Sequence, residues 1–334
     1  MILKRFTLLV LLLFCQNCFA ENRIVDGSDA DENTHPYMVS LFPSYSVPDN
    51  AEKGHFCGGS LIAPDLVLTA AHCLENFVNN PEEISVASGS INLKNPNLKI
   101  SRAKSILIHP NYTSSGEHFS DDIGLLKLST SLSASTIEVL DPVADSAITA
   151  GTAVNIMGWG LSGIDSDSLE LPSILQVANH SLVSQNICEQ ELTAVPYDRS
   201  TMYCIGNPLN QNSPTPCYGD SGSPMITKLS NQDKIIGIAS WGDRPCYYQD
   251  YMAYTRAANY YDWIFANHEY PLFGKKNPQV TANKFTSPGQ VPIGAKLKCT
   301  GEEFSETPVS SYAVWNIQKK DALSQVTLPI NEEF

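Results

Sequence analysis

The chain has 334 residues, of which 43% are hydrophobic and 17% are charged, and its formal net charge is -14. These proportions are typical of a globular protein and argue against intrinsic disorder. The acidic charge and the scattered Lys and Arg residues argue against a nucleic-acid partner, because such a surface repels phosphate. The length allows one large domain, or one domain with a small second one.

The first 20 residues have the pattern of a secretory signal peptide. Lys4 and Arg5 precede a short apolar run, residues 6–14, and a small residue, Ala20, closes the segment. This order of charge, apolar core and small residue is typical of a cleaved leader, and the run is too short to span a bilayer comfortably. We expect cleavage after Ala20 and secretion by an extracellular or periplasmic route, and no later stretch predicts a membrane span.

The cysteines indicate disulfide bonds. Cys15 and Cys18 lie within the predicted leader. In an exported chain the remaining cysteines are expected to pair, and their odd number leaves at least one unpaired or joined to another molecule. No C-x-x-C or His/Cys cluster has metal-ligand spacing, so we expect neither a metal nor another cofactor. The remaining cysteines are Cys57, Cys73, Cys188, Cys204, Cys217, Cys246 and Cys299.

Residues 24–258 consist of short β-type runs separated by Gly, Pro and Asn turns. Many short strands at this spacing predict an all-β barrel or sandwich. The clearest runs are residues 60–63, 66–69, 154–157 and 235–239.

The character of the sequence changes after residue 258. Residues 259–267 predict a helix that carries Tyr260, Trp263 and Ile264 on one face. Residues 271–292 are rich in Pro, Gly, Lys and Asn and resemble a linker. The C-terminal extension, residues 270–334, is small for an independent fold. Three of its segments predict strands: residues 297–302, 310–317 and 325–330.

Three segments together suggest hydrolysis by an activated hydroxyl, which needs a nucleophile, an oriented base and fixed N–H donors. Ser221 is flanked by glycines in Gly219-Asp220-Ser221-Gly222, His72 follows a strand-like run, and Asp122 stands at the start of an apolar strand. Taken singly, the glycine-flanked Ser221 indicates only a turn, His72 is an ordinary structural histidine, and Asp122 is an acidic residue of a solvated turn.

Together these segments resemble the chymotrypsin/trypsin family of serine proteases, in which His, Asp and Ser follow in this chain order. The resemblance covers residues 24 to about 268, and the extension lies outside it. Four further matches support it: Arg23-Ile24-Val25-Asp26-Gly27, Cys57-Gly58-Gly59-Ser60-Leu61, Gly158-Trp159-Gly160 and Ser240-Trp241-Gly242.

The resemblance implies an all-β fold of two six-stranded antiparallel Greek-key β-barrels, closed by a C-terminal helix, with the site in the cleft between them. It also implies a domain order of signal peptide 1–20, activation segment 21–23, protease domain 24–269 and extension 270–334. The disulfides it implies are Cys57–Cys73, Cys188–Cys204 and Cys217–Cys246, which leaves Cys299 over.

The resemblance also implies the catalytic roles. Ser221 attacks the carbonyl of a protein or peptide substrate, His72 is the general base, and Asp122 orients His72. The N–H groups of Gly219 and Ser221 form the oxyanion hole.

Activation follows from the same resemblance. A cut after Arg23 frees the amine of Ile24, which pairs with Asp220 and orders the oxyanion loop. A buried carboxylate without such a partner is costly.

The substrate pocket departs from the trypsin pattern. Thr215 stands where trypsin-type enzymes hold an acid for Arg or Lys, so a basic side chain would enter without a counter-ion. Met252 replaces a usual glycine and should shorten the pocket, whereas Gly242 leaves one wall open. We therefore predict a preference for small or medium apolar P1 residues and activation by a separate, trypsin-like protease. The predicted pocket residues are Thr215, Ser240, Trp241, Gly242 and Met252.

One more departure concerns the nucleophile loop. Ser223 replaces a usual glycine, and a serine there is strained if the position needs a positive φ. Two other readings stay open: a pseudoprotease that binds a partner without cleaving it, and an adhesive or surface-bound protein that uses the extension.

Overall fold

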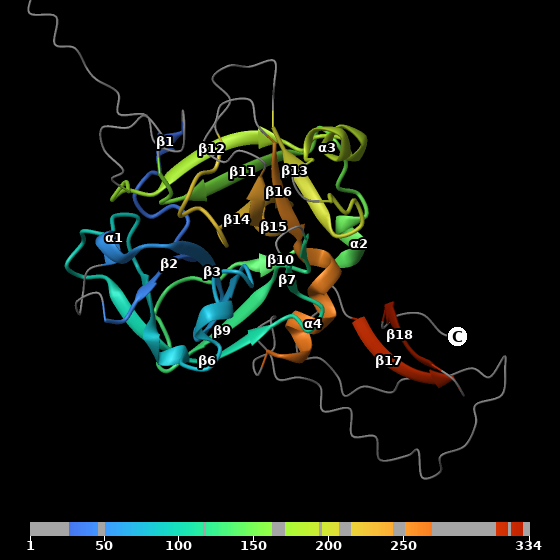
Figure 1. Ribbon diagram of the computed structural model, residues 1–334, viewed down its shortest axis with the longest axis horizontal. Coiled ribbons are helices and arrows are strands. Elements are labelled where there is room, and N and C mark those ends of the chain that lie inside the picture. Colours follow the sequence, from blue (N-terminus) through green and yellow to red (C-terminus); the bar gives the residue numbers. More distant parts are fainter. Residues whose placement is uncertain are drawn as a thin grey trace, which may run out of the picture. The chain divides into compact units, whose positions relative to one another are not determined.

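Figure 1 shows a computed structural model of the chain. It describes residues 27–45, 51–115, 118–161, 171–193, 196–206, 215–242 and 251–268, and the backbone of two strands at 312–319 and 322–329. The chain divides into two compact units, Met1–Leu272 and Phe273–Phe334. The predicted signal peptide, Arg23, Ile24, the linker, Cys246 and Cys299 lie outside the described residues.

The first half of the larger unit is a closed antiparallel barrel with the strand order β2-β3-β4-β9-β6-β5 (Figure 1, blue to teal). Every residue of β3, β4 and β5 is buried. Their Val, Leu and Ile side chains fill the interior, as expected for short strands of a small barrel. The strands are β2 Met38–Pro43, β3 Cys57–Ala63, β4 Leu66–Thr69, β5 Ile84–Ser88, β6 Lys99–Ile108 and β9 Gly124–Leu128.

The second half is an eight-stranded sheet with the main order β1-β12-β11-β14-β15-β16-β13, to which β10 adds by parallel pairing with β15. An isolated antiparallel bridge between Leu182 and Ile205 links the end of β12 to β13. The strands are β1 Ser28–Asp29, β10 Glu138–Val139, β11 Ala153–Gly158, β12 Gln176–Ser181, β13 Met202–Ile205, β14 Pro224–Leu229, β15 Gln232–Gly242 and β16 Met252–Arg256.

This arrangement confirms the predicted fold class and refines its second half. The six strands from β11 to β16 correspond to the expected second barrel, and in the described residues the Leu182–Ile205 bridge brings its ends together. The two short strands, β1 and β10, are additions that have only two residues each. One hydrophobic cluster includes residues of both halves, such as Leu68 of β4 and Ile238 of β15, so the two halves share a core.

Short helices and a hairpin complete the larger unit. The predicted helix at 259–267 is present as a 3-10 turn, η3, followed by α4; Tyr260 and Ile264 are buried, and Trp263 packs against the core. The elements are α1 Ala51–Gly54, η1 Glu75–Phe77, η2 Pro81–Glu83, β7 Thr113–Ser115, β8 His118–Ser120, α2 Pro142–Asp145, α3 Gln185–Glu191, η3 Ala257–Tyr260 and α4 Tyr261–Ala266.

In the smaller unit, β17 (Tyr312–Lys319) and β18 (Ala322–Pro329) form an antiparallel hairpin. Two of the three strands predicted for the extension overlap these elements, and residues 297–302 lie outside the described residues. Among the described residues, no helix is long and apolar enough to cross a membrane.

Candidate active site

His72 lies in a short turn directly after β4. Its position is held by the disulfide between Cys57 at the start of β3 and Cys73. The N–H groups of Leu74 and Glu75 both donate to the carbonyl of Ala71, which closes the turn. The side chain of His72 is 22% exposed, so a substrate can reach it from one side.

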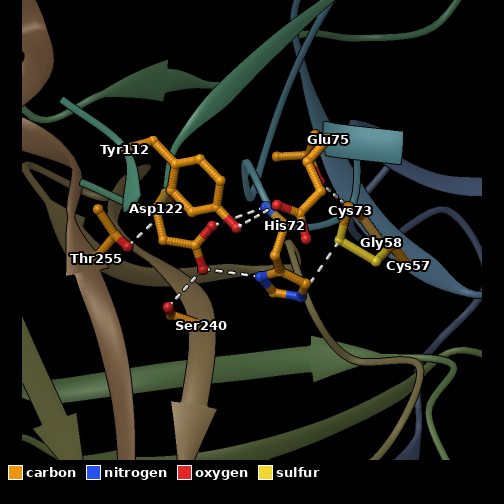
Figure 2. Close-up of polar contacts among 10 residues, drawn as sticks. Cys57, Gly58, His72, Cys73, Glu75, Tyr112, Asp122, Ser240 and Thr255 are labelled. Atoms are coloured by element: carbon orange, nitrogen blue, oxygen red, sulfur yellow. Dashed lines mark hydrogen bonds and ion pairs between the residues drawn. A yellow bond between two sulfur atoms is a disulfide. The ribbon is translucent and has the colours of Figure 1, made fainter. Parts of the chain in front are cut away.

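Asp122 is completely buried beside His72, and Figure 2 shows its carboxylate between the imidazole and Ser240. Its Oδ1 accepts the backbone N–H of His72 at 2.9 Å, and its Oδ2 lies 2.8 Å from His72 Nδ1. The hydroxyl of Ser240 donates to the same Oδ2 at 2.5 Å. The sequence assigned Ser240 to the substrate pocket, whereas the structure directs its hydroxyl to this carboxylate.

Two tertiary contacts fix the backbone around Asp122. The hydroxyl of Thr255 donates to the carbonyl of Asp122 at 2.9 Å. The preceding residue, Asp121, has a φ of 51°, a conformation that non-glycine residues rarely adopt. Its Oδ1 accepts the hydroxyl of Tyr260 at 3.0 Å, so the C-terminal 3-10 turn supports the strained residue.

The charges of His72 and Asp122 stabilise each other. Burial disfavours the imidazolium, but the charge of Asp122 and its hydrogen bond outweigh burial and raise the pKa of His72, with a further contribution from Glu75. Burial also opposes ionisation of Asp122, yet the charge of His72 and the hydrogen bonds from His72 and Ser240 lower its pKa. Because the carboxylate holds the Nδ1 proton, Nε2 is left free to accept a proton.

The Ser221 turn packs directly on the segment that precedes His72. The N–H of Gly58 donates to the carbonyl of Ser221 at 2.8 Å. Gly222 has a φ of 78°, and a Cβ on it would lie 2.1 Å from the hydroxyl of Thr69 in β4, so glycine is required there. Ser221 Oγ makes no hydrogen bond to His72 in the described contacts, as is common before a substrate tightens the site.

The two N–H groups of the predicted oxyanion hole are oriented by their neighbours. The carbonyl of Tyr218 accepts the N–H of Leu161 at 2.8 Å, and the carbonyl of Asp220 accepts the N–H of Ser223 at 3.0 Å. In a trans peptide the N–H points opposite to the carbonyl, so the N–H groups of Gly219 and Ser221 point away from these partners. Neither N–H donates to another described residue.

A buried histidine supports the same loop. His55 Nε2 lies 3.0 Å from the carbonyl of Gly219, and its Nδ1 lies 2.7 Å from Ser40 Oγ. A carbonyl can only accept, so Nε2 carries the proton and Nδ1 accepts from the serine hydroxyl. Complete burial lowers the pKa of His55 to about 4, although the Gly219 carbonyl opposes this shift, and the ring is neutral at pH 7.

Asp220 is buried immediately before Ser221. Its Oδ1 accepts the N–H of Gly160 and its Oδ2 that of Cys217, both at 2.8 Å. Burial raises its pKa to about 6, and the two N–H donors only partly offset the effect. Among the described residues, no Lys, Arg or His forms an ion pair with it.

Three of the five predicted pocket residues are buried, whereas Ser240 and Gly242 of β15 are partly exposed. Thr215, Trp241 and Met252 are 2%, 7% and 6% exposed. Gly242 pairs with Met252 across β15 and β16, and a Cβ on Gly242 would lie 2.2 Å from the Met252 sulfur. The methionine therefore occupies the space above Gly242.

The structure contains the disulfides Cys57–Cys73 and Cys188–Cys204. Cys217 is also disulfide-bonded, and its expected partner, Cys246, lies outside the described residues. Among the described residues, the one group with clustered metal-ligand atoms is Cys57, His72 and Cys73. Its two sulfurs are joined to each other and cannot act as thiolate ligands.

Sequence reasoning missed several residues that surround His72. The ring of Phe119 meets His72 edge-on at 6.2 Å. The hydroxyl of Tyr112 donates to the Glu75 carboxylate at 3.2 Å, beside His72 in Figure 2. The sequence shows only that Glu75 lies three positions after His72. The contacts made by Phe119 and Tyr112 join segments that are far apart along the chain.

Comparisons with known proteins agree with this architecture. A sequence model of the family described as Trypsin matches residues 24–264. A trypsin of Saccharopolyspora erythraea is 32% identical over 239 residues, which cover 72% of this chain and 95% of that protein. Trypsin Blo t 3 of Blomia tropicalis is 32% identical over 251 residues, 74% of this chain and 86% of that protein. Trypsin II-P29 of Gallus gallus is 34% identical over 250 residues, which cover 73% of this chain and 88% of that protein. The chain therefore belongs to the trypsin family of serine endopeptidases.

Proposed function

We propose that this protein is a secreted endopeptidase that is made as an inactive precursor and cleaves peptide bonds through an acyl-enzyme intermediate. Ser221 attacks the substrate carbonyl, His72 takes the proton and returns it to the leaving amine, and Asp122 orients the imidazole and stabilises its charge. The N–H groups of Gly219 and Ser221 stabilise the oxyanion.

The observation that carries this proposal is the His72–Asp122 contact of 2.8 Å beside the Ser221 turn. The carboxylate is fully buried and raises the pKa of the imidazole, so His72 can hold a proton transiently as the serine attacks. The two oriented N–H groups supply the second requirement of acyl transfer.

A fluorophosphonate probe tests the catalytic assignment. The full-length precursor and its Ser221→Ala variant are labelled before and after brief trypsin treatment. We expect labelling only in the wild type and only after cleavage between Arg23 and Ile24. An absence of labelling despite confirmed cleavage at that bond refutes the assignment and favours a binding protein without catalytic activity.

Activation by a cut after Arg23 is supported by the state of Asp220. A fully buried carboxylate with two backbone donors and a pKa raised to about 6 lacks a cation among the described residues. The freed ammonium of Ile24 has the charge that would lower this pKa and stabilise the loop that contains Ser221. The leader-like residues 1–20 support secretion, and the disulfides suit an oxidising compartment.

The pocket residues support cleavage after small or medium apolar residues. Thr215 offers no counter-ion to Arg or Lys, and Met252 occupies space above Gly242. Some relatives are named trypsin, but an uncompensated charge in a buried pocket is strongly disfavoured. The enzyme should therefore not cut after its own Arg23, and a separate protease activates it.

A peptide library that varies only P1 tests this preference on the activated enzyme. We expect Ala and Val at P1 to be cleaved faster than Lys and Arg. The double variant Thr215→Asp with Met252→Gly should reverse the order, because it supplies a carboxylate and opens the pocket. Faster cleavage after Lys or Arg by the wild type contradicts the proposed specificity.

A further inference from the structure

Backbone strain beside the proposed active site lies at Asp121. The sequence raised this possibility for Ser223, but Ser223 is absent from the residues with positive φ. Asp121 has a φ of 51°, which is unfavourable for a residue with a Cβ, although Asp tolerates it better than most residues. Such a conformation persists only where surrounding contacts hold it. Because Asp121 and Asp122 share a peptide unit, the contacts that hold Asp121 also limit where Asp122 can lie.

The contacts of Asp121 come from three segments. The hydroxyl of Tyr260 in η3 donates to Asp121 Oδ1 at 3.0 Å. The carbonyl of Asp121 accepts the N–H of Ile123 at 2.8 Å, and the carbonyl of Ile123 accepts the N–H of His109 at 3.1 Å. The backbone on both sides of Asp122 is therefore tied down, and Tyr260 fixes the side chain that precedes it.

His109 also faces the Asp121 carboxylate, but it does not replace the tyrosine as a donor. Its Nδ1 lies 3.7 Å from Asp121 Oδ1 and accepts the backbone N–H of Asn111 at 3.4 Å. Burial lowers the pKa of His109 against the opposing effect of the Asp121 charge, so the ring is neutral at pH 7. A neutral imidazole nitrogen that accepts a proton cannot donate one as well. Among the described residues, the side-chain donor to Asp121 is therefore Tyr260.

The phenol of Tyr260 is held firmly in place. Tyr260 is 4% exposed and belongs to the hydrophobic cluster that joins the two halves of the larger unit. Its ring meets His109 edge-on at 4.9 Å, and His109 meets Trp263 of α4 in the same way at 5.1 Å. Close packing of this kind leaves the hydroxyl little freedom, so it can fix the position of the group that it binds.

Tyr260 carries no charge while His72 titrates. Burial, the charge of Asp121 and its hydrogen bond raise the pKa of Tyr260 far above its usual value of 10, with smaller contributions from Asp198 and Asp122. The pKa of His72, by contrast, depends on the charge and the hydrogen bond of Asp122. Replacing Tyr260 by Phe therefore removes no charge near His72. A change in the titration of His72 in that variant must come from a displaced Asp122.

We propose that Tyr260 is a positioning residue for Asp122: its hydroxyl holds Asp121 in the left-handed conformation and so keeps the neighbouring carboxylate directed at His72. This inference rests on the proposed catalytic role of Asp122. It makes the C-terminal turn, 139 residues from Asp121 along the chain, part of the apparatus that orients the imidazole. Without the hydroxyl, Asp121 relaxes toward an ordinary backbone conformation and Asp122 moves away from Nδ1.

The kinetics of Tyr260→Phe test the proposal. The precursor is cleaved by trypsin, the trypsin is removed, and kcat and KM are measured across the acid limb with the peptide that the wild type cleaves fastest. We expect kcat to fall about tenfold, less than the loss of about a hundredfold that a displacement of about 1 Å can cause. KM should stay within about twofold, because the lost positioning acts in the transition state.

The acid limb gives a second readout of the same variant. It should move to lower pH, because a displaced Asp122 supports the imidazolium of His72 less. Glu75, the other acidic residue that raises the pKa of His72, is unchanged in this variant. An unchanged kcat, or an acid limb that does not move, overturns the role of Tyr260.

Tyr203→Phe is the matched control. Tyr203 is also 4% exposed, and its hydroxyl donates to the Asp145 carboxylate at 2.9 Å. Among the described contacts, neither Tyr203 nor Asp145 touches His72 or Asp122. This variant loses a comparable hydrogen bond, but its kcat and its acid limb should equal those of the wild type. Equal effects in Tyr203→Phe and Tyr260→Phe mean general loosening of the fold and overturn the proposal.

Two changes at Asp121 separate the hydrogen bond from the charge. Asp121→Ala removes the acceptor and disfavours the positive φ, so its kcat should fall at least as far as that of Tyr260→Phe. Asp121→Asn keeps an acceptor for the Tyr260 hydroxyl and tolerates the same conformation, so it should recover most of this loss. Equal losses in the two variants contradict the proposal.

Failure of the proposed function has a different signature. If the activated wild type neither reacts with the fluorophosphonate probe nor cleaves peptides, the proposed function fails and this inference fails with it. If the wild type is active and Tyr260→Phe keeps its kcat and acid limb, the role of Tyr260 alone is overturned.

Discussion

Removal of the Ser240 hydroxyl should destabilise the protein in a pH-dependent way. Ser240 Oγ donates to Asp122 Oδ2 at 2.5 Å, and the carboxylate is completely buried. In Ser240→Ala, Oδ2 retains only the contact with His72 Nδ1. A hydrogen bond to a charged group contributes about 1.5–3 kcal/mol, and we expect a loss of about 2 kcal/mol in the free energy of unfolding at pH 7.

The sign of the pH dependence follows from Asp122. Its pKa is lowered in the folded protein, so its contribution to stability is present above its unfolded pKa and is lost as the pH falls through the folded value. The Ser240 hydrogen bond is part of that contribution. The deficit of Ser240→Ala should therefore be largest near neutral pH and shrink once Asp122 is protonated.

Urea denaturation at pH 7 and at pH 3 measures this effect, in a Ser221→Ala background that prevents self-digestion. Thr255→Val is the control, because the Thr255 hydroxyl donates to the uncharged backbone carbonyl of Asp122. It should cost about 1 kcal/mol at both pH values. A Ser240→Ala deficit that is equal at the two pH values, or no larger than that of Thr255→Val, refutes the reasoning.

Three further measurements follow from the structure. Glu75→Gln removes a charge that raises the pKa of His72, so the acid limb of kcat/KM should move to lower pH. The shift should be smaller in 1 M salt, because Glu75 is exposed and its charge is screened. A shift to higher pH contradicts this. The pKa of His55 is lowered from 6.5 to about 4, so between these pH values the unfolded state binds more protons than the folded state, and the free energy of unfolding falls as the pH decreases. His55→Gln should therefore flatten the plot of unfolding free energy against pH in this range. An unchanged slope contradicts the assignment of this pH dependence to His55. Replacing both Cys188 and Cys204 by Ala removes a disulfide that joins residues 16 apart in sequence. The free energy of unfolding should fall by about 3 kcal/mol, and the melting temperature should fall with it. An unchanged melting temperature would show that the disulfide adds no stability.

The local segments of the site were readable from the sequence because their chemistry lies in neighbouring residues. The Gly219–Gly222 turn, His72 beside Cys73 and Asp122 before an apolar run each occupy only a few positions. The apolar runs at 60–63 and 66–69 became parts of β3 and β4 because short β-branched and leucine-rich segments have few alternatives to a buried strand.

The details of the second half were not readable from local patterns. Over the residues that the structure describes, an isolated bridge between Leu182 and Ile205 links the two ends of the second sheet. Pairing between distant strands depends on the register that the whole core allows, and single-strand patterns do not specify it.

The sequence by itself determined the family of this protein and indicated the proposed catalytic groups: a serine, a histidine and an aspartate in a recognisable order, with cysteines beside two of these motifs. Only the tertiary structure decided how Asp122 is held, because its partners Ser240 and Thr255 are 118 and 133 residues away. It likewise placed the hydroxyl of Ser223, which has no hydrogen-bond partner in the described part of the chain, near Asp220. The physical reason is that packing across the whole core decides which side chains are buried and which find hydrogen-bond partners. A sequence motif specifies only which donors, acceptors and charged groups are present.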